Sequence, residues 1–303
     1  PLLIAGGEFG FANPGWQRFV ELAGGAGAAV LVIPTASGDP DGNGERMVQH
    51  LRGLGAAAEL VPLTAENHAP ARDPAWVAKV EAAGGIWFIG GDQAKITAAL
   101  VQADGTDTPL LAAMRRANGK GAIIGGSSAG AAIMSARMFK EGPEPLDALR
   151  DGLVAGRHTD RGLGFIGDGW FVDQHFLARG RIGRMVVAQR DLDYRFGVGV
   201  EEDTAILVRD GMAEVVGNKG VILTDMEGAD IGPGAPVTLG NVEISFAAPG
   251  DRFALADGTV TPAEIRAKGR IDPNAPDFDP YYGETPFWTA DILGPGVLVG
   301  AMA

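Results

Sequence analysis

Short apolar runs alternate with segments of helical spacing through the first half of the chain. The runs are continuous, as in strands buried on both faces of a sheet, and lie at residues 2–5, 28–34, 58–63 and 85–89. Helical spacing is found at residues 14–22, 45–54, 74–83, 96–101 and 110–117. Strands separated by helices of this length predict an α/β fold with a doubly wound, mostly parallel sheet and flanking helices.

The second half of the chain has a different pattern. Residues 139–165 are glycine-rich and irregular, which predicts a surface excursion of the kind that forms lids. Strands are predicted at residues 170–176 and 196–200, a helix at 178–191, and antiparallel hairpins at the sheet edge over residues 204–216, 221–225 and 237–256. A short helix at 262–268 precedes a proline-rich tail, 271–303, which we expect to wrap around a single domain of residues 1–303.

One stretch, residues 122–134, carries the clearest chemical signal. An apolar strand-like run meets GGSSAG and then a run of small residues typical of a helix. Residues 126–130 fit GxSxG, the nucleophile elbow, in which a sharp strand-to-helix turn exposes the central serine, here Ser128. The N–H of Ala129 at the helix start would point to where an oxyanion forms. The alternative is a glycine-rich turn that cradles a phosphate.

A second polar segment, residues 90–93 (GGDQ), also ends a predicted parallel strand. The carboxyl ends of parallel strands meet at one edge of the sheet, where ligands bind in α/β folds. We therefore expect this segment and residues 127–130 to face one crevice, with Gly91 as the second oxyanion donor beside Ala129.

A nucleophilic serine needs a base and a group that orients the base. Of the four histidines, His50, His68 and His158 fall in a helix, a polar loop and the irregular excursion, and are predicted to be solvated. His175 ends a predicted strand and is the candidate base. The orienting carboxylate could be Glu201 or Glu202, which follow the strand 196–200, and strand alternation does not decide between them.

Composition narrows the partners. The formal net charge of −13 argues against nucleic acid, whose phosphates would be repelled. With no cysteine, the chain has neither a disulfide nor a thiolate nucleophile, and no cluster typical of metal sites is visible, so no metal and no cofactor are implied. No apolar run is long enough for a membrane span. Because the numbering opens on proline, any signal segment would lie outside it, and the compartment stays undetermined.

Four motifs in order carry a resemblance to a known family: GGDQ (90–93), GSSAGA (126–131), DQHFLARGRIGR (173–184) and GVGVEEDTA (197–205). Together they resemble the cyanophycinases of the S51 serine peptidase family, whose relatives include aspartyl dipeptidases. The resemblance implies a flavodoxin-like or class I glutamine-amidotransferase-like sandwich and a homodimer. It also implies hydrolysis of cyanophycin, a poly-aspartate carrying arginine on its side chains, to β-aspartyl-arginine dipeptides.

The same resemblance assigns roles within the motifs. It makes Ser128 the nucleophile, His175 the base and Glu202 the orienting carboxylate. It maps a set of polar residues onto the substrate pocket: Gln93, Asp173, Gln174, Arg179, Arg181 and Arg184. Bidentate arginines suit the carboxylates of such a polymer. Two alternatives are an α- or iso-aspartyl dipeptidase of the same family and a non-catalytic amidotransferase-like binding module.

Overall fold

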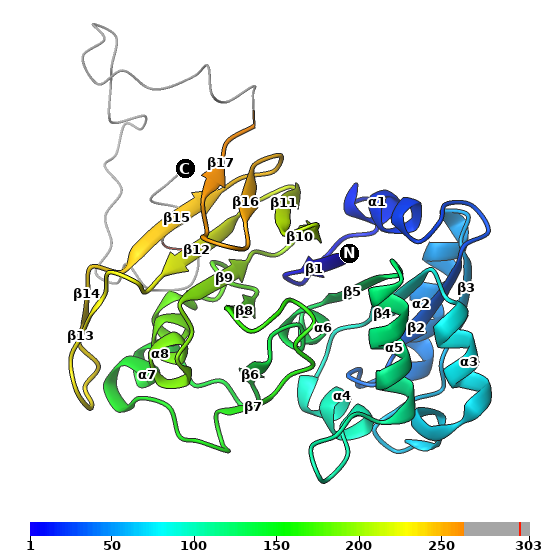
Figure 1. The fold of residues 1–303 in the computed structure, drawn as a ribbon, viewed down its shortest axis with the longest axis horizontal. Helices are drawn as coiled ribbons and strands as arrows, with labels where there is room; N and C mark the ends of the chain where they lie inside the picture. Colours follow the sequence, from blue (N-terminus) through cyan, green and yellow to red (C-terminus); the bar gives the residue numbers. More distant parts are fainter. Residues whose placement is uncertain (264–296, 298–303) are drawn as a thin grey trace, which may run out of the picture.

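The computed structural model describes residues 1–263 and residue 297. Most of the short helix predicted at 262–268, and the tail 271–303 apart from residue 297, lie outside the described residues. Figure 1 shows a central sheet with helices on both of its faces, next to a second, smaller sheet. The α/β prediction is therefore confirmed.

The main sheet has nine strands. Its parallel part has the order β1 (Leu2–Ala5), β5 (Ile123–Ser127), β4 (Gly85–Phe88), β2 (Ala29–Ile33) and β3 (Ala57–Leu60). On the other side of β1 the sheet continues with antiparallel strands: β10 (Thr204–Arg209), β11 (Met212–Gly217), β16 (Arg252–Ala254) and β17 (Val260–Thr261). The hairpin predicted at 204–216 thus extends the parallel sheet, whereas residues 221–225 and 243–247, also expected at its edge, pair in a different sheet.

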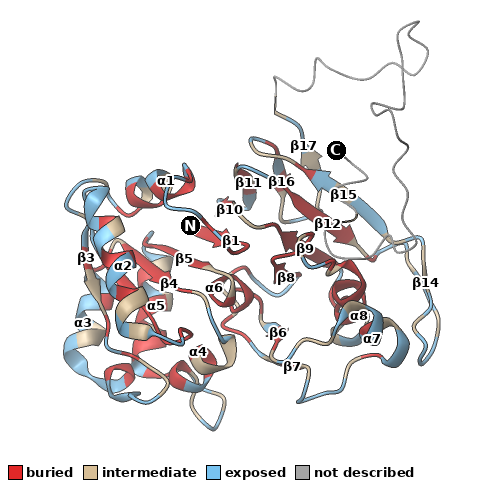
Figure 2. Cartoon of the chain, turned by 180° about the vertical axis from the view of Figure 1, so that it is seen from behind, coloured by how far each residue is buried: buried red, intermediate tan, exposed pale blue. Residues whose placement is uncertain are grey.

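Alternating side chains of the parallel strands explain their continuous apolar runs. Leu3 packs in the core under α1 (Gly15–Leu22) and α2 (Pro40–Gly53), whereas Ile4 packs in the core under α3 (Pro74–Ala82) and α5 (Pro109–Gly119). Figure 2 shows these strands buried and their helices exposed on the outer side only. Both faces of the sheet therefore need apolar residues.

The helix α2 begins earlier than residue 45, where the helical spacing predicted its start. The helix begins at Pro40, because the Asp39 side chain caps it by accepting the N–H of Gly42, and proline suits the first helical position. The turn-like composition of this segment is that of a helix start.

Four strands form a separate sheet that the sequence analysis did not predict: β15 (Glu243–Ala247), β12 (Val221–Asp225), β9 (Phe196–Val200) and β8 (Trp170–Gln174). One side of this second sheet packs through Phe171 and Ile222 toward α8 (Ile182–Leu192). The other side packs through Val198 and Val200 into the core of the main sheet. The carboxyl ends of β8 and β9 are thereby brought to β1 and to α6 (Ala129–Ala132).

The segment 139–165 is less irregular than predicted. It contains α7 (Pro145–Asp151), and β7 (Thr159–Arg161) pairs with β6 (Arg137–Phe139). The remaining elements are short: α4 (Gln93–Leu100), a 3₁₀ turn (Ala69–Arg72), and the pair β13 (Asp230–Ile231) and β14 (Leu239–Gly240).

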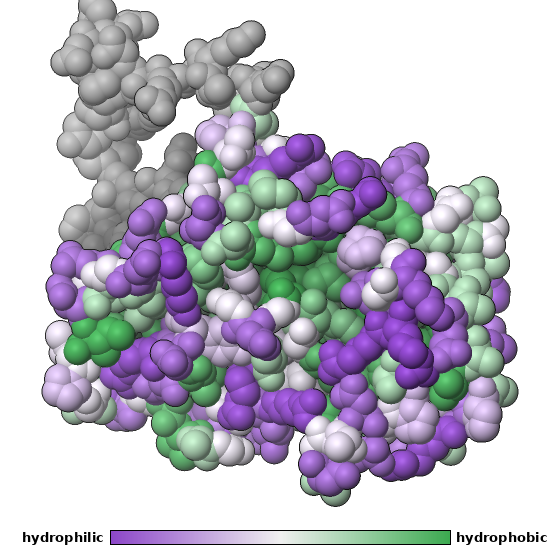
Figure 3. All heavy atoms as spheres, viewed as in Figure 1, coloured by the Kyte–Doolittle hydropathy of each residue, from purple (hydrophilic) through white to green (hydrophobic). Residues whose placement is uncertain are grey.

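The surface reflects the acidic, polar composition. Figure 3 shows hydrophilic side chains over most of one face, with hydrophobic ones gathered in its middle, where β1 and β10 lie in Figure 1. Among the described residues, no helix combines the length and the apolar character needed to cross a bilayer.

Candidate active site

The turn between β5 and α6 is as tight as the GxSxG pattern requires. Ser128 has φ 54° and ψ −109°, a conformation that a residue other than glycine rarely adopts. A Cβ on Gly126 would lie 2.6 Å from the carbonyl oxygen of Gly130, and one on Gly130 would lie 2.5 Å from that of Phe88. Both positions therefore need glycine, because strand and helix lie against each other there.

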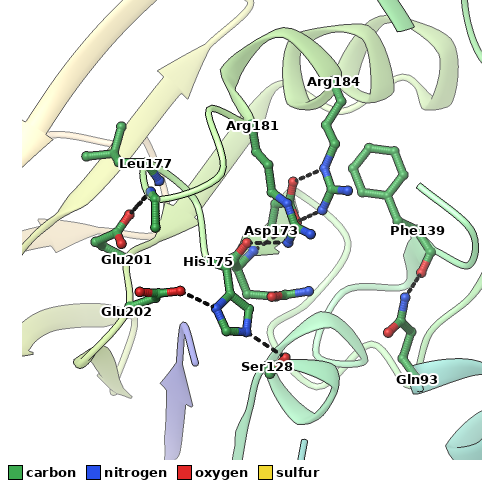
Figure 4. Close-up of polar contacts among 12 residues, drawn as sticks. Gln93, Ser128, Phe139, Asp173, His175, Leu177, Arg181, Arg184, Glu201 and Glu202 are labelled. Carbon is green, nitrogen blue, oxygen red and sulfur yellow. Dashed lines mark hydrogen bonds and ion pairs between the residues drawn. The ribbon is translucent and has the colours of Figure 1, made fainter. Parts of the chain in front are cut away.

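The imidazole of His175 lies between Ser128 and Glu202 (Figure 4). Its Nε2 is 3.0 Å from Ser128 Oγ, and its Nδ1 is 2.8 Å from Glu202 Oε1. A carboxylate can only accept, so Nδ1 carries the proton and Nε2 is left free to accept from the serine hydroxyl. The three side chains come from the ends of β5, β8 and β9.

Residues after β1 support the imidazole, and the sequence analysis gave them no role. The N–H of His175 donates to the carbonyl of Gly6 at 2.7 Å. Gly7 has φ 123°, and a Cβ there would lie 2.3 Å from the imidazole ring. The glycine pair that ends the first apolar run was the available signal, because close approach of another group is one reason for glycine at a strand end.

The environment sets the protonation of both partners. Burial lowers the pKa of His175, an effect that the hydrogen bond to Glu202 partly opposes. That same hydrogen bond lowers the pKa of the Glu202 carboxyl. At neutral pH the site therefore holds a neutral imidazole beside a carboxylate, the state required of a general base.

The two glutamates differ in what they contact. Glu202, about a quarter exposed, faces the imidazole, whereas Glu201 is buried and accepts the backbone N–H groups of Leu177 and Ala178. The structure thus resolves geometrically which carboxylate reaches His175.

The predicted oxyanion donors are the N–H groups of Ala129 and Gly91. Ala129 is the first residue of α6, and the chain at Gly90 passes so close that a Cβ there would lie 3.2 Å from Ser128 Cβ. Within residues 1–263, the N–H groups of Ala129 and Gly91 donate to no backbone or side-chain acceptor. The amide of Ala129 belongs to the residue after Ser128, and that of Gly91 to the residue after Gly90, which contacts Ser128.

Asp173 and Arg184 bind each other. The guanidinium donates to both carboxylate oxygens, at 2.7 and 2.5 Å, and lies over the ring of Phe139 at 4.4 Å. The Asp173 side chain is 2% exposed and that of Arg184 is 7% exposed. The pair is buried, and each group is bound by the other, so the bridge is part of the protein interior.

The helix predicted at 178–191 begins only at Ile182 in the structure. Arg179 and Arg181 therefore lie in the turn before α8. Gly180 has φ 59° and the N–H of Arg179 donates back to His175, so the chain is still turning there. Arg179 is exposed. Arg181 is mostly buried, and burial lowers its pKa to about 10.

The other predicted pocket residues are the two glutamines. Gln93 donates its side-chain amide to the carbonyl of Phe139 at 2.6 Å and so connects α4 to the start of the excursion. The Oε1 atom of Gln174 is buried and has no partner among the described residues. Gln174 directly precedes His175, and its Oε1 is a buried polar atom whose hydrogen-bonding capacity no described residue uses.

The remaining histidines lie elsewhere. His68 is exposed, as predicted. His158 accepts the N–H of Val154, and His50 is half-buried and stacks on Phe11 at 4.2 Å, so the prediction that His50 is solvated was wrong. Helical periodicity alone did not reveal that the loop after β1 covers this side of α2.

Among the described residues, no three histidine, aspartate or glutamate side chains are grouped as metal ligands. A cavity of about 590 Å³ lies between α7 and α8, and Ser128, His175 and Glu202 do not line it.

Comparison with known proteins agrees with this geometry. The model of peptidase family S51 matches residues 2–216. A cyanophycinase of Trichormus variabilis is 32% identical over 262 residues, covering 82% of this chain and 83% of that protein. One of Geminocystis herdmanii is 32% identical over 248 residues, covering 78% and 86%.

Among solved structures, a peptidase from an acI-B1 Actinobacterium has the same fold, with a TM-score of 0.59 at 20% identity over 80% of this chain and 95% of that one. The family match spans well over half of the chain, and it includes the strands and turns that carry Ser128, His175 and Glu202. The chain therefore belongs to peptidase family S51 and is a serine-type peptidase.

Proposed function

We propose that this peptidase hydrolyses cyanophycin through an acyl-enzyme formed on Ser128. His175 Nε2 takes the hydroxyl proton as Ser128 Oγ bonds to the carbonyl carbon of a backbone peptide bond. Glu202 holds the imidazole in the tautomer that accepts at Nε2 and stabilises the imidazolium that forms. The contacts of 3.0 and 2.8 Å on the two sides of the ring support these roles.

The tetrahedral intermediate then collapses. Its oxyanion is stabilised by the N–H groups of Ala129 and Gly91, which have no acceptor in the described part of the chain. The imidazolium returns its proton to the leaving amino nitrogen, which leaves an ester on Ser128. Water, deprotonated by His175, attacks that ester, and Ser128 regains its proton as the acid product leaves.

The observation that carries the substrate assignment is the burial of the Arg181 guanidinium. This group is mostly buried beside the serine site and donates to the carbonyl of Gln174 at 2.6 Å. Its nearest carboxylate, Asp173, is 3.7 Å away and already bound by Arg184. A buried cation with spare donors favours an anionic ligand, and the free carboxylate at the end of a poly-aspartate chain provides one.

The names of the relatives support cyanophycin as the source of this carboxylate. The two proteins reported above are cyanophycinases by name and align over most of their length with this chain. Of the three arginines implied by the resemblance, Arg184 is held by Asp173 and Arg179 is exposed. We therefore propose Arg181 as the main carboxylate clamp, with the buried Oε1 of Gln174 as an acceptor for the substrate.

The test is incubation with purified insoluble cyanophycin and mass identification of the soluble product. We expect β-aspartyl-arginine from the wild type and none from Ser128→Ala. Poly-aspartate should be cleaved up to about 10⁴-fold more slowly, because a site built for a guanidinium leaves polar groups unpaired without it. Equal rates on cyanophycin and on α-aspartyl dipeptides that lack arginine would replace this proposal with a dipeptidase.

A further inference from the structure

Glu201 is a buried carboxylate that the mechanism above does not use. Its side chain is 2% exposed, although it precedes Glu202 directly and lies at the end of the same strand. Burying a carboxylate costs several kcal/mol unless hydrogen bonds or an opposite charge compensate the loss of water. The compensating groups therefore indicate what this residue does.

Those groups belong to the turn that carries His175. Glu201 Oε2 accepts the backbone N–H of Leu177 at 2.5 Å and that of Ala178 at 3.0 Å. Residues 175–181 form this turn, which we call the histidine turn, and it leads into α8. In Figure 4 the Glu201 carboxylate reaches Leu177, while Glu202 reaches the imidazole. Glu201 thus holds the backbone of the histidine turn, whereas Glu202 holds the imidazole ring of His175.

The histidine turn needs such a support. His175 has φ 47°, a left-handed conformation that is unfavourable for a residue with a Cβ atom and persists only where the surrounding structure enforces it. Within the turn, the N–H of Arg179 donates to His175 and that of Arg181 donates to Phe176, which leaves the N–H groups of Leu177 and Ala178 to Glu201. The carboxylate therefore satisfies the donors that the turn itself cannot.

Lys219 adds a charge that both glutamates share. Its Nζ is 3.6 Å from Glu201 Oε1 and 3.9 Å from Glu202 Oε2, and its side chain is about half exposed. The backbone N–H of Lys219 donates to Thr204 Oγ1 at 3.0 Å, which ties this loop to the start of β10. One cation thus lies opposite two adjacent carboxylates, reducing their mutual repulsion.

We propose that Glu201 is a positioning residue: it caps the histidine turn and so keeps the His175 imidazole in reach of both Ser128 and Glu202. This inference rests on the proposed serine mechanism. It assigns different tasks to the two glutamates, since Glu202 orients the ring directly and Glu201 acts only through the backbone of the turn.

The experiment measures how fast a fluorophosphonate labels Ser128, because that rate depends on the His175 base and not on which substrate the enzyme prefers. The variants are Glu201→Ala, Glu201→Gln and Glu202→Gln, with Glu214→Ala as a matched control. Glu214 is a partly buried carboxylate of β11 that pairs with Arg18 and Arg252 away from the site. Melting temperature, kcat and KM on cyanophycin are measured on the same samples.

We expect Glu201→Ala to slow labelling and lower kcat by about 10- to 100-fold, the effect of a displaced base, with KM changed by less than about threefold. Glu201→Gln keeps the length and one acceptor oxygen, so it should restore part of the rate. It also keeps the test valid if Glu201→Ala does not fold. Glu214→Ala should lower the melting temperature at most and leave the labelling rate at the wild-type value.

Two results would overturn the inference. Wild-type labelling rates in both Glu201 variants, with only a lower melting temperature, would show that Glu201 merely stabilises the fold. If Glu201→Gln were labelled as slowly as Ser128→Ala, and Glu202→Gln at nearly the wild-type rate, then Glu201 would be the orienting carboxylate itself. A wild type that is labelled but does not cut cyanophycin would refute the substrate assignment alone. A wild type that is not labelled would refute both proposals.

Discussion

Two strand-to-helix connections carry the reactive side chains, and they are built in different ways. Between β5 and α6 the chain turns within one residue, and Ser128 takes φ 54°. Between β8 and α8 it turns over several residues, and His175, the first of them, takes φ 47°. Both reactive residues thus occupy a positive-φ position directly after a strand, a conformation that functional sites often enforce at a cost.

The difference lies in what enforces that conformation. The serine turn relies on two glycines of its own motif, Gly126 and Gly130, and the N–H of Ser128 also donates to the carbonyl of Ala5 in β1. The histidine turn is held by remote groups, namely the carbonyl of Gly6, the missing side chain of Gly7 and the carboxylate of Glu201. Both turns contact β1, but the histidine turn depends in addition on the carboxylate of Glu201 at the end of β9, whereas the serine turn carries its glycines within its own motif.

The largest effect is expected at the serine turn. Ser128→Ala should leave the fold and the melting temperature unchanged and lower kcat by about 10⁴-fold or more, because only oxyanion binding and substrate positioning remain. Ser127→Ala is the matched control, since Ser127 is the last residue of β5 and its hydroxyl contacts neither His175 nor Glu202. The measurement is steady-state kinetics on cyanophycin. An inactive Ser127→Ala together with an active Ser128→Ala would make Ser127 the nucleophile.

The next effect tests the remote support of the histidine turn. Gly7→Ala places a methyl group 2.3 Å from the imidazole and requires φ 123°, so the ring must move. A displacement of about 1 Å can cost about 100-fold in rate, and we expect kcat to fall by at least that factor along with a lower melting temperature.

Gly10→Ala is the control for that change. An added Cβ at Gly10 would meet its nearest neighbour, an oxygen of Asp203, at 3.6 Å, which is ordinary contact. The control should keep wild-type kinetics and stability. Equal kcat values for the Gly7 and Gly10 variants would mean that the histidine turn does not depend on β1.

The same contrast explains what the sequence could predict. The serine turn and the alternation of strands and helices are local patterns, and they were found correctly. The second sheet, the start of α8 and the burial of His50 depend on contacts between segments far apart in sequence, so no local pattern carried them.

Individual residues of the candidate site show the same difference between what local patterns predict and what distant contacts decide. Parity along β9 could not separate Glu201 from Glu202, because both sides of the strand are covered. The choice of Glu202 came from family resemblance, and in the structure it is the carboxylate that reaches His175. Arg184 could not be recognised as the partner of Asp173, since their pairing needs α8 to begin at Ile182 and to pack back on β8.

A third prediction separates the two arginines near the histidine turn. Arg181→Lys should lower kcat/KM by about tenfold with little change in stability, because an ammonium keeps the charge but cannot make two parallel hydrogen bonds to a carboxylate. Arg184→Ala should instead destabilise the protein by about 3–5 kcal/mol, because it leaves Asp173 buried without its partner. Urea unfolding and steady-state kinetics are measured on both variants. An Arg181→Lys variant that lost stability but kept its kcat/KM would contradict the proposed difference between the two arginines.

The smallest expected effect concerns pH and the exposed Arg179. Burial lowers the pKa of His175 below its ordinary 6.5, and the positive charge of Arg179 adds to that lowering. Activity needs the neutral imidazole, so kcat/KM should hold its plateau below pH 6.5 and then fall about tenfold per pH unit. The free energy of unfolding falls in the same direction, because the unfolded histidine binds its proton at a higher pH than the folded one.

Arg179→Met removes the charge but keeps the backbone hydrogen bond from Arg179 to His175, and it should raise the pKa of His175, so the acid limb of the profile moves to higher pH. Water and salt screen an exposed charge, so the loss of activity on that limb should stay below about threefold, with the plateau unchanged. The pH dependence of kcat/KM at low and high salt measures this effect, which should shrink in the wild type as salt rises. An acid limb that moved to lower pH in Arg179→Met would show that Arg179 does not act on His175 through its charge.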